Sequence, residues 1–125
     1  MNKLLDYQSF LESKGMPIST FNPGSKEFAL TVEDSFQAIK LLEDSNVAII
    51  GGDVISDDSG KLRYAYQLWG SEYHYLNWAC EPVDDESREE YVLRSFSVAS
   101  EGICAANDHA KKLKKNCFIV LVTEA

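Results

Sequence analysis

The segment from Val47 to Glu81 constrains the fold most, because it combines β-branched and aromatic residues with turn residues. Its first part, VAIIGGDVIS, is rich in valine and isoleucine, and its second part, KLRYAYQLWG, alternates apolar with polar or small residues. This period of two is typical of strands that have one face in a core. The tetrapeptide Asp57–Gly60 between them suits a tight turn. The pattern predicts a hairpin, followed by a third strand in YHYLNWACE.

Helical patterns flank this segment. Apolar residues from Leu4 to Leu11 share one helical stripe that ends at Gly15, and a second helix fits Val32–Asp44 with Thr31 as its cap. The longest helix is predicted over Glu86–Ala110, after a run of acids that suits a helix N-terminus. Its apolar stripe consists of Val92, Phe96, Ala99, Ile103, Ala106 and Ala110.

These elements predict one α+β domain that occupies residues 1–125. The apolar run Cys117–Val122 suits an interior strand, which gives a mixed or antiparallel sheet of about four strands. We expect the long C-terminal helix to pack on one face of the sheet and the two N-terminal helices to complete the core. The sequence has neither a membrane-length apolar run nor an apolar N-terminal signal region, so we expect a cytoplasmic protein with no membrane contact.

The charge of the chain limits its partners. Twenty acidic and twelve basic side chains give a formal net charge of −8, and ten of the acids but only three of the bases lie between Asp53 and Glu90. Direct nucleic-acid binding is not expected, because it needs a basic surface that neutralises phosphates. The acidic segment serves either solubility and helix capping or the binding of a basic protein.

Motifs for catalysis, metals and cofactors are weak. Gly51-Gly52-Asp53 resembles the start of the GGDEF motif of cyclic-dinucleotide synthesis, but Val54 and Ile55 follow it and the chain has no phosphate-binding loop. Two glycines in a strand rather predict a bulge or the close approach of another backbone, with Asp53 on the rim. We therefore predict no enzyme, no metal site and no cofactor.

The histidines and cysteines do not change this interpretation. His74 and His109 belong to no metal-binding spacing, and the odd cysteine count predicts three reduced thiols, at Cys80, Cys104 and Cys117. In strand geometry His74 and Cys80 would lie about 20 Å apart, too far for a catalytic pair.

Aromatic residues gather in the same segment, at Tyr64, Tyr66, Trp69, Tyr73, Tyr75 and Trp78. They form either cross-strand core pairs or a recognition face. Alternation along the third predicted strand places Tyr73 and Tyr75 toward solvent, with Leu76 and Trp78 toward the core.

The order of these elements resembles the bacterial immunity proteins of polymorphic toxin systems, and in particular the immunity protein 40 group. The likeness covers residues 33–123, and its most specific parts are Gly51-Gly52-Asp53 and Asn77-Trp78. It implies a small cytosolic protein that binds and blocks a cognate secreted toxin domain, as in contact-dependent inhibition. It implies no catalysis and no cofactor, and it does not transfer a binding site.

We therefore infer the interface from charge and aromatic residues. Many toxins of these systems are nucleases with basic clefts, so the partner is expected to be a basic toxin domain. Acids at the rim are expected to steer it, and tyrosines to supply the buried contact. The expected partner-binding residues are Asp53, Asp57, Asp58, Glu72 and Glu81 with Tyr64, Tyr66, Tyr73 and Tyr75. Two alternatives stay open: a cytosolic adaptor that uses the same surface, and a small-ligand enzyme with a pocket at His74 or Asp53.

Overall fold

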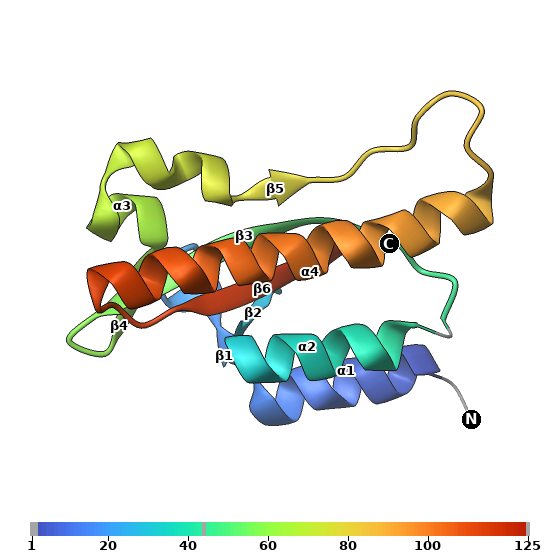
Figure 1. Ribbon diagram of the computed structural model, residues 1–125. Helices are drawn as coiled ribbons and strands as arrows, with labels where there is room; N and C mark the ends of the chain where they lie inside the picture. The colour runs from blue at the N-terminus through green and yellow to red at the C-terminus, as the bar shows by residue number, and fades with distance from the viewer. Residues whose placement is uncertain (1–2, 44, 125) are drawn as a thin grey trace.

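The computed structural model describes residues 3–43 and 45–124 of the protein, with side chains from Asp6 onward (Figure 1). The expectations for Asp44 and for the side chains of Leu4 and Leu5 lie outside the described part. The helices are α1 (Lys3–Lys14), α2 (Val32–Leu42), α3 (Ala65–Trp69) and α4 (Arg88–Leu113), with 3-10 helices η1 (Ile18–Thr20) and η2 (Ser71–Leu76). The strands are β1 (Met16–Pro17), β2 (Phe28–Thr31), β3 (Ile49–Asp58), β4 (Lys61–Tyr64), β5 (Trp78–Ala79) and β6 (Phe118–Thr123).

These elements form an α+β fold around one antiparallel sheet in the order β1-β2-β6-β3-β4. β6 lies between β2 and β3, which confirms that the last apolar run is an interior strand. The outer edge of β3 is shared: β4 pairs with its end, from Ile55 to Asp58, and β5 pairs with Gly51 and Gly52. The expected hairpin is confirmed, with Ser59 and Gly60 at positive φ in its turn.

Helix α4 packs on one face of the sheet beside α2, and α1 lies against α2 (Figure 1). All six residues of its predicted apolar stripe are buried, which confirms this helix and its orientation. It starts at Arg88 because Ser87 is its N-cap: the Ser87 hydroxyl accepts a hydrogen bond from the Glu90 amide, and the Glu90 side chain accepts one from the Ser87 amide. The main core lies between α4, α2 and the sheet.

A smaller core covers the opposite face of the sheet. Ile55 of β3 and Val120 of β6 pack there with Ile18 of η1 and Ala29 of β2. Residues along a strand alternate between faces, so Asp53 lies on the same side as Ile55, away from α4. We call this side of the sheet the back face.

The third predicted strand is largely wrong, and the second strand of the hairpin ends at Tyr64, earlier than predicted. The chain leaves the sheet after Tyr64 and forms α3 and η2, and only Trp78 and Ala79 return as β5. Continued pairing of β4 beyond Tyr64 would occupy the part of the β3 edge that β5 takes. Gly70, at φ 130°, allows the reversal between the two short helices.

The inward and outward assignments within this region are partly confirmed. Leu76 is buried, Trp78 packs against the main core and Tyr75 is 65% exposed, as expected. Tyr73 was expected in solvent but packs against the core, because η2 is helical and does not alternate like a strand. The sheet also has six strands, since β1 and the short FALT strand β2 were not predicted.

Candidate functional site

The Gly-Gly-Asp and Asn-Trp motifs meet where β5 joins β3. The Trp78 indole lies between Gly52 and Gly102 of α4: a Cβ atom would fall 2.2 Å from ring atom Cη2 at Gly52 and 2.7 Å from Cε3 at Gly102. The Asn77 Oδ1 accepts a 2.8 Å hydrogen bond from the Val54 amide, which lies between the residues of β3 that pair with β4 and β5. At Gly51 a Cβ atom would fall 2.6 Å from the Trp78 carbonyl oxygen, which confirms the predicted close approach of another backbone, whereas Gly52 makes room for a side chain. These motifs therefore build the scaffold.

The structure divides the nine expected partner-binding residues among separate places. Asp53, Tyr64 and Tyr66 lie together with His74, whereas Glu72, Tyr73 and Tyr75 belong to η2. The remaining three residues, Asp57, Asp58 and Glu81, lie at the β3–β4 turn and in the segment after β5. A single continuous rim around a three-stranded meander does not form, because α3 and η2 replace the end of the second expected strand and the start of the third.

A row of rings runs from the back face to η2. Phe21 meets Tyr64 edge to face at 5.0 Å between ring centroids, Tyr64 stacks with Tyr66 at 5.9 Å, and Tyr66 meets His74 at 4.6 Å. The Asn22 amide donates a 3.0 Å hydrogen bond to the Tyr64 hydroxyl. The tyrosines are therefore held in place and half-buried, with part of each ring facing solvent.

Two carboxylates, Asp53 and Glu27, lie beside this row, and neither forms an ion pair with a lysine or arginine of the described residues. Burial raises the pKa of Asp53, an effect that nearby His74 opposes, and burial together with Asp53 raises the pKa of Glu27. Both carboxylates also raise the pKa of Tyr64, although burial is the larger cause. Among the described residues the ion pairs are Arg88–Glu124 and Arg94–Glu86, so neither carboxylate has a lysine or arginine partner there. We call Glu27, Asp53, Tyr64, Tyr66 and His74 the acidic–aromatic patch.

Sequence reasoning missed Glu27. It lies outside the acidic segment and before a strand too short to show a periodic pattern. The fold brings it to Asp53 only because β2 pairs with β6 next to β3.

Helix η2 is attached to α4 through His109. The Tyr75 hydroxyl and the His109 Nε2 lie 3.1 Å apart, and the Tyr73 ring lies 5.6 Å from the imidazole centroid. Tyr73 also meets Trp69 edge to face. Tyr73 therefore holds the helix in place, while the side chains of Tyr75 and Glu72 are exposed.

The other expected residues differ in their surroundings. The Asp57 carboxylate accepts a 2.9 Å hydrogen bond from Asn116, and Asp58 is exposed beside the turn. Glu81 has an exposed side chain, and its carbonyl accepts a 2.6 Å hydrogen bond from the Arg94 guanidinium. These residues can contribute long-range charge, but among the described residues no side-chain hydrogen bond or ion pair joins them to the acidic–aromatic patch.

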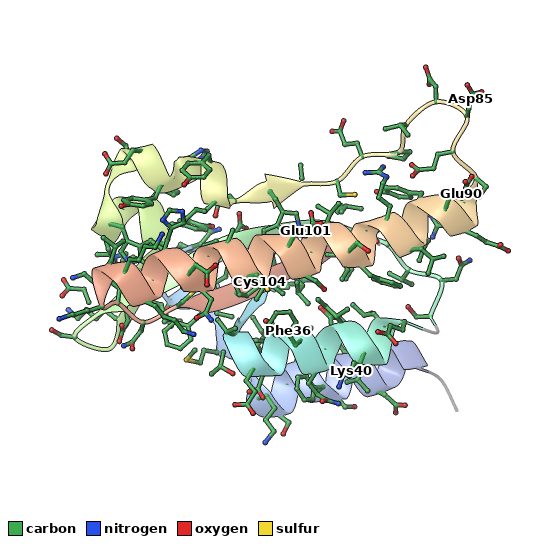
Figure 2. All side chains as sticks on the ribbon, in the orientation of Figure 1. Phe36, Lys40, Asp85, Glu90, Glu101 and Cys104 are labelled. Atoms are coloured by element: carbon green, nitrogen blue, oxygen red, sulfur yellow. The ribbon has the colours of Figure 1, made fainter. Side chains whose placement is uncertain are left out.

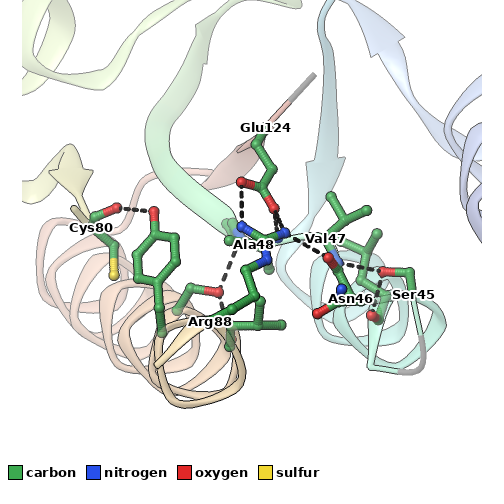
Figure 3. A network of polar contacts seen from close by, with 12 residues as sticks. Ser45, Asn46, Val47, Ala48, Cys80, Arg88 and Glu124 are labelled. Carbon is green, nitrogen blue, oxygen red and sulfur yellow. Dashed lines mark hydrogen bonds and ion pairs between the residues drawn. The ribbon is translucent and has the colours of Figure 1, made fainter. Parts of the chain in front are cut away.

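A second polar network holds the start of α4 against the sheet (Figure 3). Arg88 pairs with Glu124 after β6 and donates to the Asn46 carbonyl, and Glu124 accepts from the Ala48 amide at 2.8 Å. The Ser95 hydroxyl accepts from the Ile49 amide and donates to the Val92 carbonyl. Each charged group here has a partner, so the network is structural.

Catalytic arrangements are not evident in the described part of the chain. No group of three or more His, Cys, Asp and Glu side chains in residues 3–43 and 45–124 could hold a metal ion. The three cysteines are unpaired; Arg94 donates to the buried Cys80 sulfur, and burial raises the pKa of the Cys117 thiol to about 12. Cys117 is partly buried and Cys104 is exposed.

Hollows of about 580 and 510 Å³ adjoin β4, and neither is lined by Asp53 or His74, the two residues considered for a small-ligand pocket. No helix in the described residues has the length and apolar composition that crossing a membrane requires.

Comparison with known proteins gives one match. A family model described as Immunity protein 40 matches residues 10–123, so the likeness extends further toward the N-terminus than the expected residues 33–123. Comparisons with curated proteins and with solved structures find no match.

Proposed function

Because this chain belongs to the immunity protein 40 family, it is an immunity protein against a toxin, and we propose that it neutralises a secreted toxin domain by covering its active surface. The producing cell and its kin are protected when the toxin of a contact-dependent system arrives in the cytoplasm. In this proposal the protein has no catalytic role and needs no cofactor. Its partner is a basic protein domain, such as a nuclease, and it binds neither nucleic acid nor membrane directly.

The acidic–aromatic patch is the observation that supports this proposal. Burial disfavours ionisation of Asp53 and Glu27, repulsion from Asp53 adds to this effect at Glu27, and no described lysine or arginine pairs with either carboxylate. A lysine or arginine of the toxin would relieve that repulsion in surroundings that screen it less than open water does. Tyr64 and Tyr66 present rings beside the carboxylates, and aromatic rings are favoured contacts at protein interfaces.

The other expected residues have graded roles in this proposal. Tyr75 and Glu72 on η2 extend the contact, and Tyr73 holds η2 against α4. Asp57, Asp58 and Glu81 act at longer range, because exposed charges influence association over a Debye length of about 8–10 Å. The formal net charge of −8 favours encounter with a basic partner in the same way.

Binding kinetics with the toxin domain encoded by the adjacent gene, measured at two salt concentrations, test the proposal. Glu72→Lys should mainly slow association and flatten its salt dependence. Tyr75→Ala should mainly speed dissociation, at a cost of about 2 kcal/mol in binding free energy. Tyr75→Phe keeps the ring and removes only the hydroxyl near His109. Comparison of the two variants therefore separates the loss of the ring's contact with the toxin from the loss of the interaction with His109.

The control is Glu12→Lys, which makes the same charge change on the exposed surface of α1. Equal effects of Glu72→Lys and Glu12→Lys would mean that net charge, and not this surface, governs association. A wild-type protein that neither binds the toxin nor protects cells would contradict the proposal and favour the adaptor alternative.

A further inference from the structure

Two surface hollows lie end to end between α2 and α4. One of about 400 Å³ is lined by the end of α2 and the first turns of α4, and one of about 410 Å³ by the turns that follow. Glu43 lines both, so the two hollows adjoin at this residue, and we call the pair the α2–α4 groove. Figure 2 shows the two helices that border it, with Phe36 and Lys40 labelled on α2 and Glu101 on α4.

The groove has an apolar floor. Ile39, Val92 and Phe96 line it and belong to the main core, and each keeps 5–8% of its surface exposed. Leu93 also lines the groove and is 66% exposed, which makes it one of the most exposed large apolar side chains among the described residues. A partner that covers the groove therefore removes apolar surface from water.

The rim of the groove is acidic. Glu43, Glu89 and Glu101 are among the lining residues, which include no lysine or arginine. Lys40, which is labelled in Figure 2, is exposed on α2 and lines neither hollow. Apolar floor and acidic rim together fit a segment with an apolar face and lysine or arginine on its flanks.

The backbone chemistry of the groove favours a helical segment. Its walls are two helices whose backbone groups are already paired within each helix, so an extended chain would find no hydrogen-bond partners there. A helix satisfies its own backbone and can place apolar side chains four and seven residues apart into successive hollows. From Glu89 to Glu101, α4 rises about 18 Å, which corresponds to about three helical turns.

We propose that the α2–α4 groove binds a short cationic amphipathic helix of the toxin, and this inference rests on the proposed function. The groove lies along the N-terminal half of α4, and η2 packs on its C-terminal half through His109. A toxin that covers the exposed side of α4 contacts both surfaces. The groove supplies apolar contacts that slow dissociation, and the charges of the remaining surface raise the association rate.

The test uses the full-length protein and the toxin domain encoded by the adjacent gene. Leu93→Glu and Glu101→Lys should each speed dissociation about tenfold, because one removes the apolar contact and the other opposes the cations of the helix. Val83→Glu is the matched control, since Val83 is an apolar side chain that is 58% exposed and lies outside the groove. Unchanged thermal unfolding of all three variants confirms that they are folded.

Carboxyl labelling of the free protein and of the complex supplies a second measurement. Glu43 and Glu101 should lose reactivity in the complex, whereas the exposed Glu12 of α1 should keep it. If Leu93→Glu and Glu101→Lys bind like the wild type while Tyr75→Ala is weakened, the groove proposal is wrong and the proposed function stands. An equal loss for Val83→Glu would also refute the groove, and a wild type that does not bind refutes both proposals.

Discussion

Replacement of Gly102 by alanine tests whether the Trp78 indole is held between β3 and α4. The added Cβ would lie 2.7 Å from Cε3 and 2.9 Å from Cδ2 of the indole, well inside van der Waals contact. The ring cannot simply move away, because Gly52 leaves no more room on its other side. Strain is therefore expected in α4, in β5 or in the ring itself.

Two opposing effects determine the size of the change. Alanine in a helix interior is favoured over glycine by about 1 kcal/mol, whereas overpacking costs about 1–3 kcal/mol. The free energy of unfolding should therefore fall by about 0–2 kcal/mol in the wild-type background. In a Trp78→Ala background the indole is absent, so Gly102→Ala should raise it by about 1 kcal/mol.

Urea unfolding of the wild type, both single variants and the double variant measures this coupling as a thermodynamic cycle. Trp78→Ala alone should cost about 3 kcal/mol, which leaves a protein of ordinary stability folded. Ala105→Gly, at an exposed position of α4, is the control for helix propensity and should cost about 1 kcal/mol in either background. A Gly102→Ala variant that is stabilised equally in both backgrounds would refute the placement of the ring.

Three further predictions concern the core and the patch. Asn77→Ala leaves the Val54 amide without its partner and should lower the free energy of unfolding by about 1–3 kcal/mol, whereas Asn77→Asp keeps the acceptor and should cost less in the same urea assay. Phe96→Asp places a charge in the main core and should cost several kcal/mol, so a melting temperature within a few degrees of the wild type would contradict the assigned face of α4. Asp53 has a raised pKa in the folded protein, so its ionised form disfavours folding above that pKa and the penalty disappears as the pH falls. Asp53→Asn should therefore raise the melting temperature at pH 7 more than at pH 4, measured by calorimetry, and slow toxin binding.

Local patterns in the sequence were sufficient to predict the long elements of the fold. The stripe of α4 repeats over many turns, and a continuous apolar run such as β6 has few alternatives at its length. The β3–β4 turn follows from residues that tolerate positive φ. In each case the information lies within one element, so no knowledge of its neighbours was needed.

The region from Ala65 to Leu76 could not be predicted in that way. Its aromatic and apolar residues fit a period of two, but Ala65 and Trp69 are also four residues apart and share one side of α3. What decides between strand and helix is the edge of β3, which β4 and β5 must share. The acidic–aromatic patch was half predicted for the same reason: Asp53, Tyr64 and Tyr66 were expected, but the proximity of Glu27 and His74 depends on strand order and on the fold of η2.

Most residues that carry the family likeness have a structural role in the fold. Gly52 makes room for the Trp78 ring, and Asn77 accepts a hydrogen bond from the Val54 amide of β3, a residue that pairs with neither β4 nor β5. Only Asp53 of the two motifs lies on the back face beside the half-buried rings of Tyr64 and Tyr66, where burial raises its pKa. A match of these motifs therefore identifies the scaffold and says little about which toxin is bound. In the proposed function, recognition depends on residues outside this junction, such as Tyr66, Tyr75 and Leu93, because they can change without disturbing the contacts of β3, β5 and α4.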